Sequence, residues 1–433
     1  IYTTGVFRNT VDFDPGPGSF FLTAAEDNIF ILKLDINGNF IWAKHCSNIS
    51  AGASYGAGIA LDAQNNIYVT GTFSGTVDFD PGPASLTISA NTVEIFVLKL
   101  DVNGNFTWLR QLGEQQPGSG SQGRGSCIKI DPSGNVIVAG TYHGIGDFDP
   151  GPGILNLGTS TAASCTFMTK LDANGNLLWA KATEGGSFTP DVAMVLDNSG
   201  NIFVTAGFNG ATDFDPGTGI FTLVSTAIAS TSIFIFKLEA NGNFSWAKMM
   251  AGGPGFGASI VTDNAGNVYS TGKFAGTVDF DPGPGTNNLV YTGTANIYIS
   301  RLNNAGNFTG ARQLGGNSDS EGTGISIGSN GSVYITGIFS GKVDFDPGSL
   351  VYELSSTGSS DAFVAKLNLI GNLDWAVRMG GTGNARSNAI ITDDMGSVYT
   401  CGHFDQTVDF DFTPVNYSLS SNGANDLFIH KII

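Results

Sequence analysis

Short runs of β-branched and aromatic residues alternate with turns rich in Gly, Asn and Asp along the whole chain. One stretch contains four such runs in succession: GIALD from Gly58, NIYVTGTF from Asn66, EIFVLKLD from Glu94 and NFTWLRQLG from Asn105. Asn-Gly and Asp/Gly turns between apolar runs are typical of β-hairpins. The pattern predicts four antiparallel strands, A to D, that form one sheet.

The tripeptide DFD shows that this pattern is repeated. Its first aspartate recurs at intervals of 66, 69, 66, 66, 65 and 65 residues, which gives seven copies. A fixed period of this length indicates a repeat architecture, and radially arranged four-stranded sheets leave few exposed strand edges. We therefore expect an all-β fold, a seven-bladed β-propeller of four-stranded antiparallel blades. We expect one domain over residues 1–433, with blades at about 1–55, 56–121, 122–189, 190–255, 256–321, 322–386 and 387–433.

The two ends of the chain fall inside this repeat. The opening IYTTG matches strand B, and the closing DLFIHKII matches strand C, so strands A and D each occur six times. We expect the chain to be a segment of a longer protein, with flanking domains on the same polypeptide. No signal peptide is visible, which means little when the sequence starts within a repeat.

Charge and composition exclude some classes of partner. The formal net charge is -18, from 19 Lys and Arg against 37 Asp and Glu. Nucleic acid binding needs a basic face, so we expect no nucleic acid partner. No apolar stretch is long enough to suggest a transmembrane segment. The four cysteines occupy different repeat positions without metal-site spacing, so we expect small buried residues and no disulfide framework.

Three further columns of residues recur with the repeat, and each favours a structural role. Asp-Asn-Gly loops between strands resemble calcium loops but lack their further carboxylates, so we expect plain hairpin turns. The five tryptophans share one position of strand D, where Gly310 stands in the sixth copy, and we expect them to pack between blades. Strand C carries one base in every copy, and we expect structural ion pairs with aspartates such as Asp62 and Asp101. These bases are Lys33, Lys99, Lys170, Lys237, Arg301, Lys366 and Lys431.

The repeat also resembles a known family. The runs GIALD and NIYVTG, together with DAFVAKLNLIGNLDWAVRMGG from Asp361 to Gly381, resemble the SBBP-type bacterial β-propeller repeat along essentially the whole chain. The TVDFDPG segment is similar to a variant in secreted Bacteroidetes surface proteins, many of which carry a sorting domain for type IX secretion. The resemblance implies a propeller that is secreted or displayed at the cell surface.

The acidic segment DFDPG lies between strands B and C, and two interpretations of it compete. In the first, Asp-Pro-Gly forms a β-turn in which the aspartates accept backbone N–H bonds. In the second, two adjacent carboxylates bind Ca²⁺, which would brace the loops. The candidate ligands are Asp12, Asp14, Asp78, Asp80, Asp147, Asp149, Asp213, Asp215, Asp279, Asp281, Asp344, Asp346, Asp409 and Asp411.

The connections between strands D and A lie on the same predicted face and vary most between copies. We expect a ligand to contact residues there, with candidates Phe188, Asp191, Phe256, Asp319, Glu321 and Arg386. The four histidines show no metal or nucleophile-base spacing, and no GxSxG occurs, so we expect no enzyme activity. An extracellular adhesion or interaction module that binds a protein or glycan at the cell surface is favoured. The alternatives are a structural spacer in a surface assembly and, less favoured, a carbohydrate-active enzyme.

Overall fold

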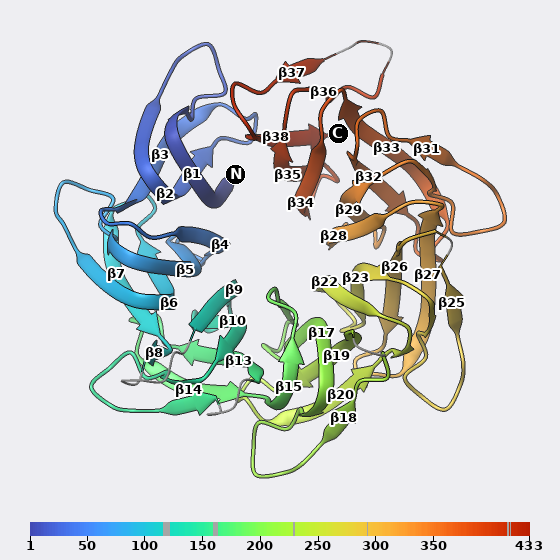
Figure 1. The fold of residues 1–433 in the computed structure, drawn as a ribbon, viewed down its shortest axis with the longest axis horizontal. Helices are drawn as coiled ribbons and strands as arrows, with labels where there is room; N and C mark the ends of the chain where they lie inside the picture. Colours follow the sequence, from blue (N-terminus) through green and yellow to red (C-terminus); the bar gives the residue numbers. More distant parts are fainter. Residues whose placement is uncertain (116–121, 159–162, 228–229, 292, 414, 416) are drawn as a thin grey trace. The chain divides into compact units, whose positions relative to one another are not determined.

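The computed structural model describes residues 1–433 except 116–121, 159–162, 228–229, 292, 414 and 416. The described residues form strands and turns, with no helix among them, which confirms the all-β fold class. The chain divides into two compact units, coloured from blue to red in chain order in Figure 1. One unit comprises Ile1–Met194, Gly210–Leu223 and Glu239–Phe244; the other comprises Val195–Asn209, Val224–Leu238 and Ser245–Ile433.

The first unit contains the predicted four-stranded sheet. In the second repeat β4 pairs with β5, β5 with β6 and β6 with β7, all antiparallel and in chain order, as expected for strands A to D. The third repeat follows the same order with β9, β10, β13 and β14 (Figure 1). The first repeat contributes β1, β2 and β3. The bounds are β1 (Tyr2–Asp12), β2 (Phe21–Leu34), β3 (Phe40–Asn48), β4 (Ser54–Leu61), β5 (Ile67–Asp78), β6 (Thr87–Leu100), β7 (Phe106–Leu112), β9 (Gln122–Ile130), β10 (Val136–His143), β13 (Ser164–Leu171) and β14 (Leu177–Ala182).

The second unit repeats this arrangement. Its four-stranded sheets run β22-β23-β26-β27 and β28-β29-β32-β33, and the last repeat supplies β34-β35-β38. The fourth repeat contributes residues to both units, with β16 (Ala193–Leu196), β17 (Ile202–Asp213), β19 (Ser232–Leu238) and β20 (Phe244–Met249). The other bounds are β22 (Gly255–Thr262), β23 (Val268–Phe274), β26 (Asn296–Leu302), β27 (Phe308–Gly316), β28 (Ser320–Ile327), β29 (Val333–Phe339), β32 (Asp361–Leu367), β33 (Leu373–Gly381), β34 (Ala385–Thr392), β35 (Val398–Phe404) and β38 (Asp426–Ile432). The number of blades around one axis and the single-domain assignment stay predictions.

From the second repeat onward, each acidic segment begins a small hairpin that also pairs with the preceding repeat. At the end of β5, Val77 and Asp78 pair with Asn48 and Ser47, which end strand D of the first repeat. The same three-stranded pairing joins β8, β11 and β12, and β21, β24 and β25. It recurs at β27-β30-β31 and β33-β36-β37, and β15 and β18 flank the end of β17. The bounds are β8 (Glu114–Gln115), β11 (Ile145–Asp147), β12 (Asn156–Gly158), β15 (Glu184–Phe188), β18 (Thr222–Val224), β21 (Ala251–Gly252), β24 (Thr277–Asp279), β25 (Asn288–Val290), β30 (Lys342–Asp344), β31 (Glu353–Ser355), β36 (Thr407–Asp409) and β37 (Ser418–Ser420).

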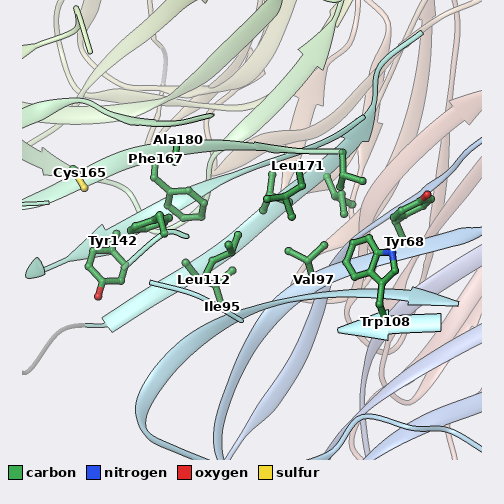
Figure 2. Close-up of a cluster of buried hydrophobic side chains, with 14 residues drawn as sticks. Tyr68, Ile95, Val97, Trp108, Leu112, Tyr142, Cys165, Phe167, Leu171 and Ala180 are labelled. Atoms are coloured by element: carbon green, nitrogen blue, oxygen red, sulfur yellow. The ribbon is translucent and has the colours of Figure 1, made fainter. Parts of the chain in front are cut away.

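Apolar side chains of neighbouring repeats form a shared core. In Figure 2, Tyr68 and Trp108 of the second repeat belong to the same buried cluster as Tyr142 and Phe167 of the third. The predicted packing of the tryptophan column between repeats is confirmed, because Trp108 Nε1 donates to the carbonyl of Ala173 in the next repeat at 3.2 Å. Since each sheet covers its neighbour, the repeats stabilise one another.

The structure also tests the expectations for the cysteines and the bases of strand C. All four cysteines are free thiols; Cys46 and Cys165 are buried as predicted, whereas Cys127 and Cys401 are only partly buried. Three of these bases pair with aspartates in the described part of the chain: Lys170 Nζ lies 2.8 Å from Asp131 Oδ2, Arg301 Nη2 lies 3.9 Å from Asp263 Oδ2, and Lys366 Nζ lies 3.3 Å from Asp374 Oδ2. Asp62 and Asp101 have other partners than the expected bases. Their carboxylates accept hydrogen bonds from the side chains of Asn66 and Asn105, and Lys99 donates to the backbone carbonyl of Ala173.

Candidate functional site

Both aspartates of the acidic turn accept backbone N–H groups. Asp78 Oδ1 accepts from Asp80 at 3.1 Å and from Leu86 at 2.8 Å, and Asp80 Oδ1 accepts from Gly82 at 2.8 Å. The remaining six copies repeat all three bonds, with distances between 2.7 and 3.1 Å. The last copy keeps them without Pro-Gly, because Thr413 replaces glycine as the donor; its Pro414 and Asn416 lie outside the described residues.

The phenylalanine between the two aspartates anchors the turn. Val77 and Phe79 are fully buried, as the expected strand alternation requires, whereas Asp78 and Asp80 are only half-buried. The Phe79 ring packs edge-on against Phe73 at 5.1 Å between centroids. The DFD motif therefore combines a buried phenylalanine with two aspartates that accept hydrogen bonds from backbone N–H groups. These hydrogen bonds support the structural interpretation of the turn.

Calcium would need ligands beyond the two carboxylates of each turn, since it takes six to eight oxygen ligands. Among the described residues no group of three or more His, Cys, Asp and Glu side chains is arranged to hold a metal ion. One oxygen of each aspartate is already committed to backbone donors. The turns therefore fit calcium only if carbonyl groups and water complete the shell, and calcium binding stays a prediction.

Three of the predicted ligand-binding residues come together in the second unit. Arg386 Nη2 lies 2.7 Å from Glu321 Oε1, and Lys273 Nζ lies 3.4 Å from Glu321 Oε2. The same lysine sits over the ring of Phe256, 5.5 Å from its centroid. The network continues from Arg386 Nε to Asn388 Oδ1 at 3.2 Å. All these side chains are half-buried or exposed, so a partner can reach them.

His403 lies at the end of this network. Its Nδ1 is 3.4 Å from Asn388 Nδ2, and its strand register places it directly opposite Arg386. Burial lowers the pKa of His403, and the positive charge of Arg386 lowers it further. The imidazole is therefore neutral over most of the physiological range, which leaves Arg386 and Lys273 as the cations of this site.

Phe256, Glu321 and Arg386 occupy equivalent positions in their repeats, which we call the pre-glycine position. In five repeats, one glycine or serine of strand A lies opposite a glycine of strand B. The pre-glycine residue comes directly before that strand A residue, and a β-bulge follows the pair. Bulges re-aim side chains and are frequent at functional sites. Tyr55, Arg124, Phe256, Glu321 and Arg386 occupy the position.

The other three predicted residues are placed differently. Phe188 lines a cavity in the first unit, together with Arg124. Asp191 and Asp319 are exposed. Their backbone carbonyls accept hydrogen bonds from Thr189 Oγ1 and from Ser340 Oγ, respectively. The structure therefore does not bring these two carboxylates into the charged network. Sequence reasoning missed Arg124 and Lys273, because only the cross-strand register places them beside the predicted residues.

Comparisons with known proteins support a repeat-containing, β-rich fold. No family model matches the chain. An uncharacterized WD repeat-containing protein of Acanthamoeba polyphaga mimivirus is 25% identical over 475 residues, which cover 94% of this chain and 33% of that protein. The chain thus spans about a third of the length of this relative. The regulatory protein FlaEY of Caulobacter vibrioides is 26% identical over 170 residues, 35% of this chain and 18% of that protein.

Two solved structures are also similar. A protein of unknown function from Dyadobacter fermentans has a TM-score of 0.37 at 12% identity, over 86% of this chain and 92% of its own. The PQQ domain of pyranose dehydrogenase from Coprinopsis cinerea has a TM-score of 0.34 at 10% identity, over 82% and 94% of the two chains. No helix in the described part of this chain is long and apolar enough to cross a membrane.

Proposed function

We propose that this chain is a non-catalytic interaction module that recognises a protein partner through the pre-glycine positions. The observation that carries this proposal is the contrast within each repeat. The acidic turn, its hydrogen bonds and its buried phenylalanine recur in every copy, whereas the pre-glycine position changes from Tyr55 to Arg124, Phe256, Glu321 and Arg386. Fixed backbone with varied side chains is the arrangement that recognition requires.

The residue types at this position suit a protein partner. Aromatic residues and Arg are enriched at interfaces because they bury large areas and form directed hydrogen bonds. Tyr55 is 44% exposed, and Phe256, Glu321 and Arg386 form a connected patch with Lys273. Such a patch offers an apolar surface beside both signs of charge, so it can match a specific partner surface.

We further propose a location and a family. The resemblance to SBBP-type repeats favours secretion or display at the cell surface, with a role in adhesion to a protein or glycan there. Membership of that family and type IX secretion belong to this proposal. The alternative is a purely structural spacer, in which no other protein would bind the pre-glycine side chains.

Site-specific photocrosslinking tests the proposal. A benzophenone amino acid replaces Phe256, and in a control protein it replaces Met395, which is 82% exposed on a strand A to strand B turn of the same unit. We expect a defined crosslinked protein from the surface fraction of the source cells at residue 256 only. That product should decrease when Glu321→Gln and Arg386→Gln are added. Equal crosslinking at both residues, or none at residue 256, would reject the proposal.

A further inference from the structure

The first unit contains a cavity of about 200 Å³ at one end of the third-repeat sheet. Its polar walls come from Gln122, Arg124, Thr141, His143 and Ser164, and Phe188 closes one side. Among the described residues, no Asp or Glu lines this cavity, although the chain carries 37 acidic residues. A cavity lined by hydrogen-bond donors without a carboxylate is complementary to an anionic group.

Strand register explains why the polar side chains converge. In β9 and β10, Gln122 faces His143 and Arg124 faces Thr141. In β10 and β13, His143 also faces Ser164. Residues directly opposite each other in a sheet share a face, and so do residues two apart in one strand. These five side chains therefore project from the same face.

The connection after strand D holds the aromatic wall over that face. The Phe188 N–H donates to Ser164 Oγ at 2.9 Å, and Thr141 Oγ1 donates to the carbonyl of Pro190 at 3.1 Å. The Phe188 ring is further supported by Phe214 at 6.3 Å between centroids. Because Ser164 Oγ accepts this backbone bond, its hydroxyl proton is available to a ligand.

Arg124 differs from the other cations near the pre-glycine positions. Arg386 and Lys273 are both paired with Glu321. The Arg124 backbone pairs with Thr141 of β10, but its exposed guanidinium makes no hydrogen bond or ion pair with the described part of the chain. Its guanidinium therefore keeps its planar set of donors for an external group, and that set matches a carboxylate in a bidentate manner.

We propose that this cavity binds the carboxylate of an Asp or Glu side chain in an extended peptide segment of a protein partner. This inference rests on the proposed interaction function and names the chemistry that one of its sites recognises. Arg124 binds the carboxylate, and the Ser164 hydroxyl adds a donor. The Gln122 amide can both donate and accept, so it can bind the N–H and C=O groups of a peptide, and Phe188 covers an apolar part of the segment.

An array of capped heptapeptides with one central Asp or Glu tests the proposal, with matched Asn and Gln peptides as probes of the charge. Peptides selected on the array are then measured by titration against the intact chain and two variants. We expect Arg124→Gln to weaken binding by at least about tenfold and to abolish the preference for Asp over Asn. Lys129→Gln, the control, removes the same charge near the other end of β9. We expect it to change the affinity less than roughly twofold, because salt screens the attraction between a peptide in the cavity and a distant surface charge.

Three results would overturn the inference. The first is equal binding of acidic and amide peptides, and the second is an equal loss in the Arg124 and Lys129 variants. The third is binding of an oligogalacturonate without binding of any acidic peptide, since that would make the ligand a glycan. Crosslinking at residue 256 reports on the other unit, so a positive result there with no acidic peptide bound would reject this inference alone.

Discussion

The carboxylate of Asp78 binds the backbone N–H of Leu86, eight residues further along, at 2.8 Å. This bond and the 3.1 Å bond from Asp80 close the loop at the end of β5. We expect Asp78→Ala to lower the free energy of unfolding by about 2 kcal/mol, because two backbone donors lose an ionised acceptor. Asp78→Asn keeps an oxygen acceptor and should cost about half as much. Urea denaturation of both variants measures the difference, and an alanine variant as stable as the parent would refute this role.

Calcium binding by the acidic turns predicts a linked stability. An ion that binds only the folded chain raises the melting temperature with concentration. We expect calcium to raise the melting temperature, chelation to reverse the rise, and the double change Asp78→Asn with Asp80→Asn to remove part of it. Elemental analysis of the purified chain gives the number of bound ions. Unchanged melting together with no bound metal would leave the turns as backbone caps alone.

Glu94 gives the stability of the first unit a specific pH dependence. The side chain is buried beside Gln111, and burial raises its pKa to about 7, with a smaller contribution from Glu114. The folded state therefore holds a proton that the unfolded state releases nearer pH 4.5. A raised folded pKa gives stability that is present at low pH and lost as pH rises through about 7.

We expect Glu94→Gln to be more stable than the parent at pH 8, with an upper limit of roughly 3 kcal/mol, and to gain little at pH 4. Chemical denaturation at pH 8 and pH 4 measures how the free energy of unfolding changes with pH in the variant and in the parent. Glu239→Gln, at an exposed carboxylate of the same unit, is the control and should follow the parent at both values. If the stability of the Glu94 variant and of the parent depended on pH to the same extent, Glu94 would not be the source of this pH dependence.

Gly310 occupies the tryptophan position of strand D without a packing reason to be glycine. A Cβ atom there would meet nothing within 4 Å, and the residue lies opposite Arg301, next to a shift in strand register. We expect Gly310→Ala to raise the free energy of unfolding by about 0.5–1 kcal/mol, since glycine loses more backbone entropy on folding. Gly315→Ala is the contrasting variant, because its Cβ would collide with the buried Asn296 side chain. The prediction fails if both changes destabilise equally in thermal melts.

The repeat pattern predicted the strands well because each strand leaves a local signal. The runs from Gly58, Asn66, Glu94 and Asn105 correspond to β4, β5, β6 and β7, in the expected antiparallel order. The alternation in VDF correctly placed Val77 and Phe79 in the core. These features depend on residues close in sequence, where periodicity and turn chemistry carry the information.

Features that depend on cross-strand register could not be predicted in the same way. Ser47 pairs with Asp78 through the backbone, and backbone pairing leaves no mark on residue type. Lys273 reaches both Phe256 and Glu321 only because strands of two repeats lie side by side, whereas the variable loops alone suggested Asp191 and Asp319. Variability between the repeats pointed to one end of the sheets, but it did not indicate which side chains meet there.

The pairing of each acidic hairpin with the preceding repeat has a consequence for how such a chain can change length. The described junctions of this kind join a strand D end to the first aspartate of DFD and the residue before it, as at Asn48 with Val77, Gly381 with Val408 and Gln115 with Gly146. Excision of one whole period would bring together ends that already match, whereas excision of a fraction would leave a strand edge unpaired. We therefore expect gain or loss of sequence to be tolerated best in steps of a full repeat.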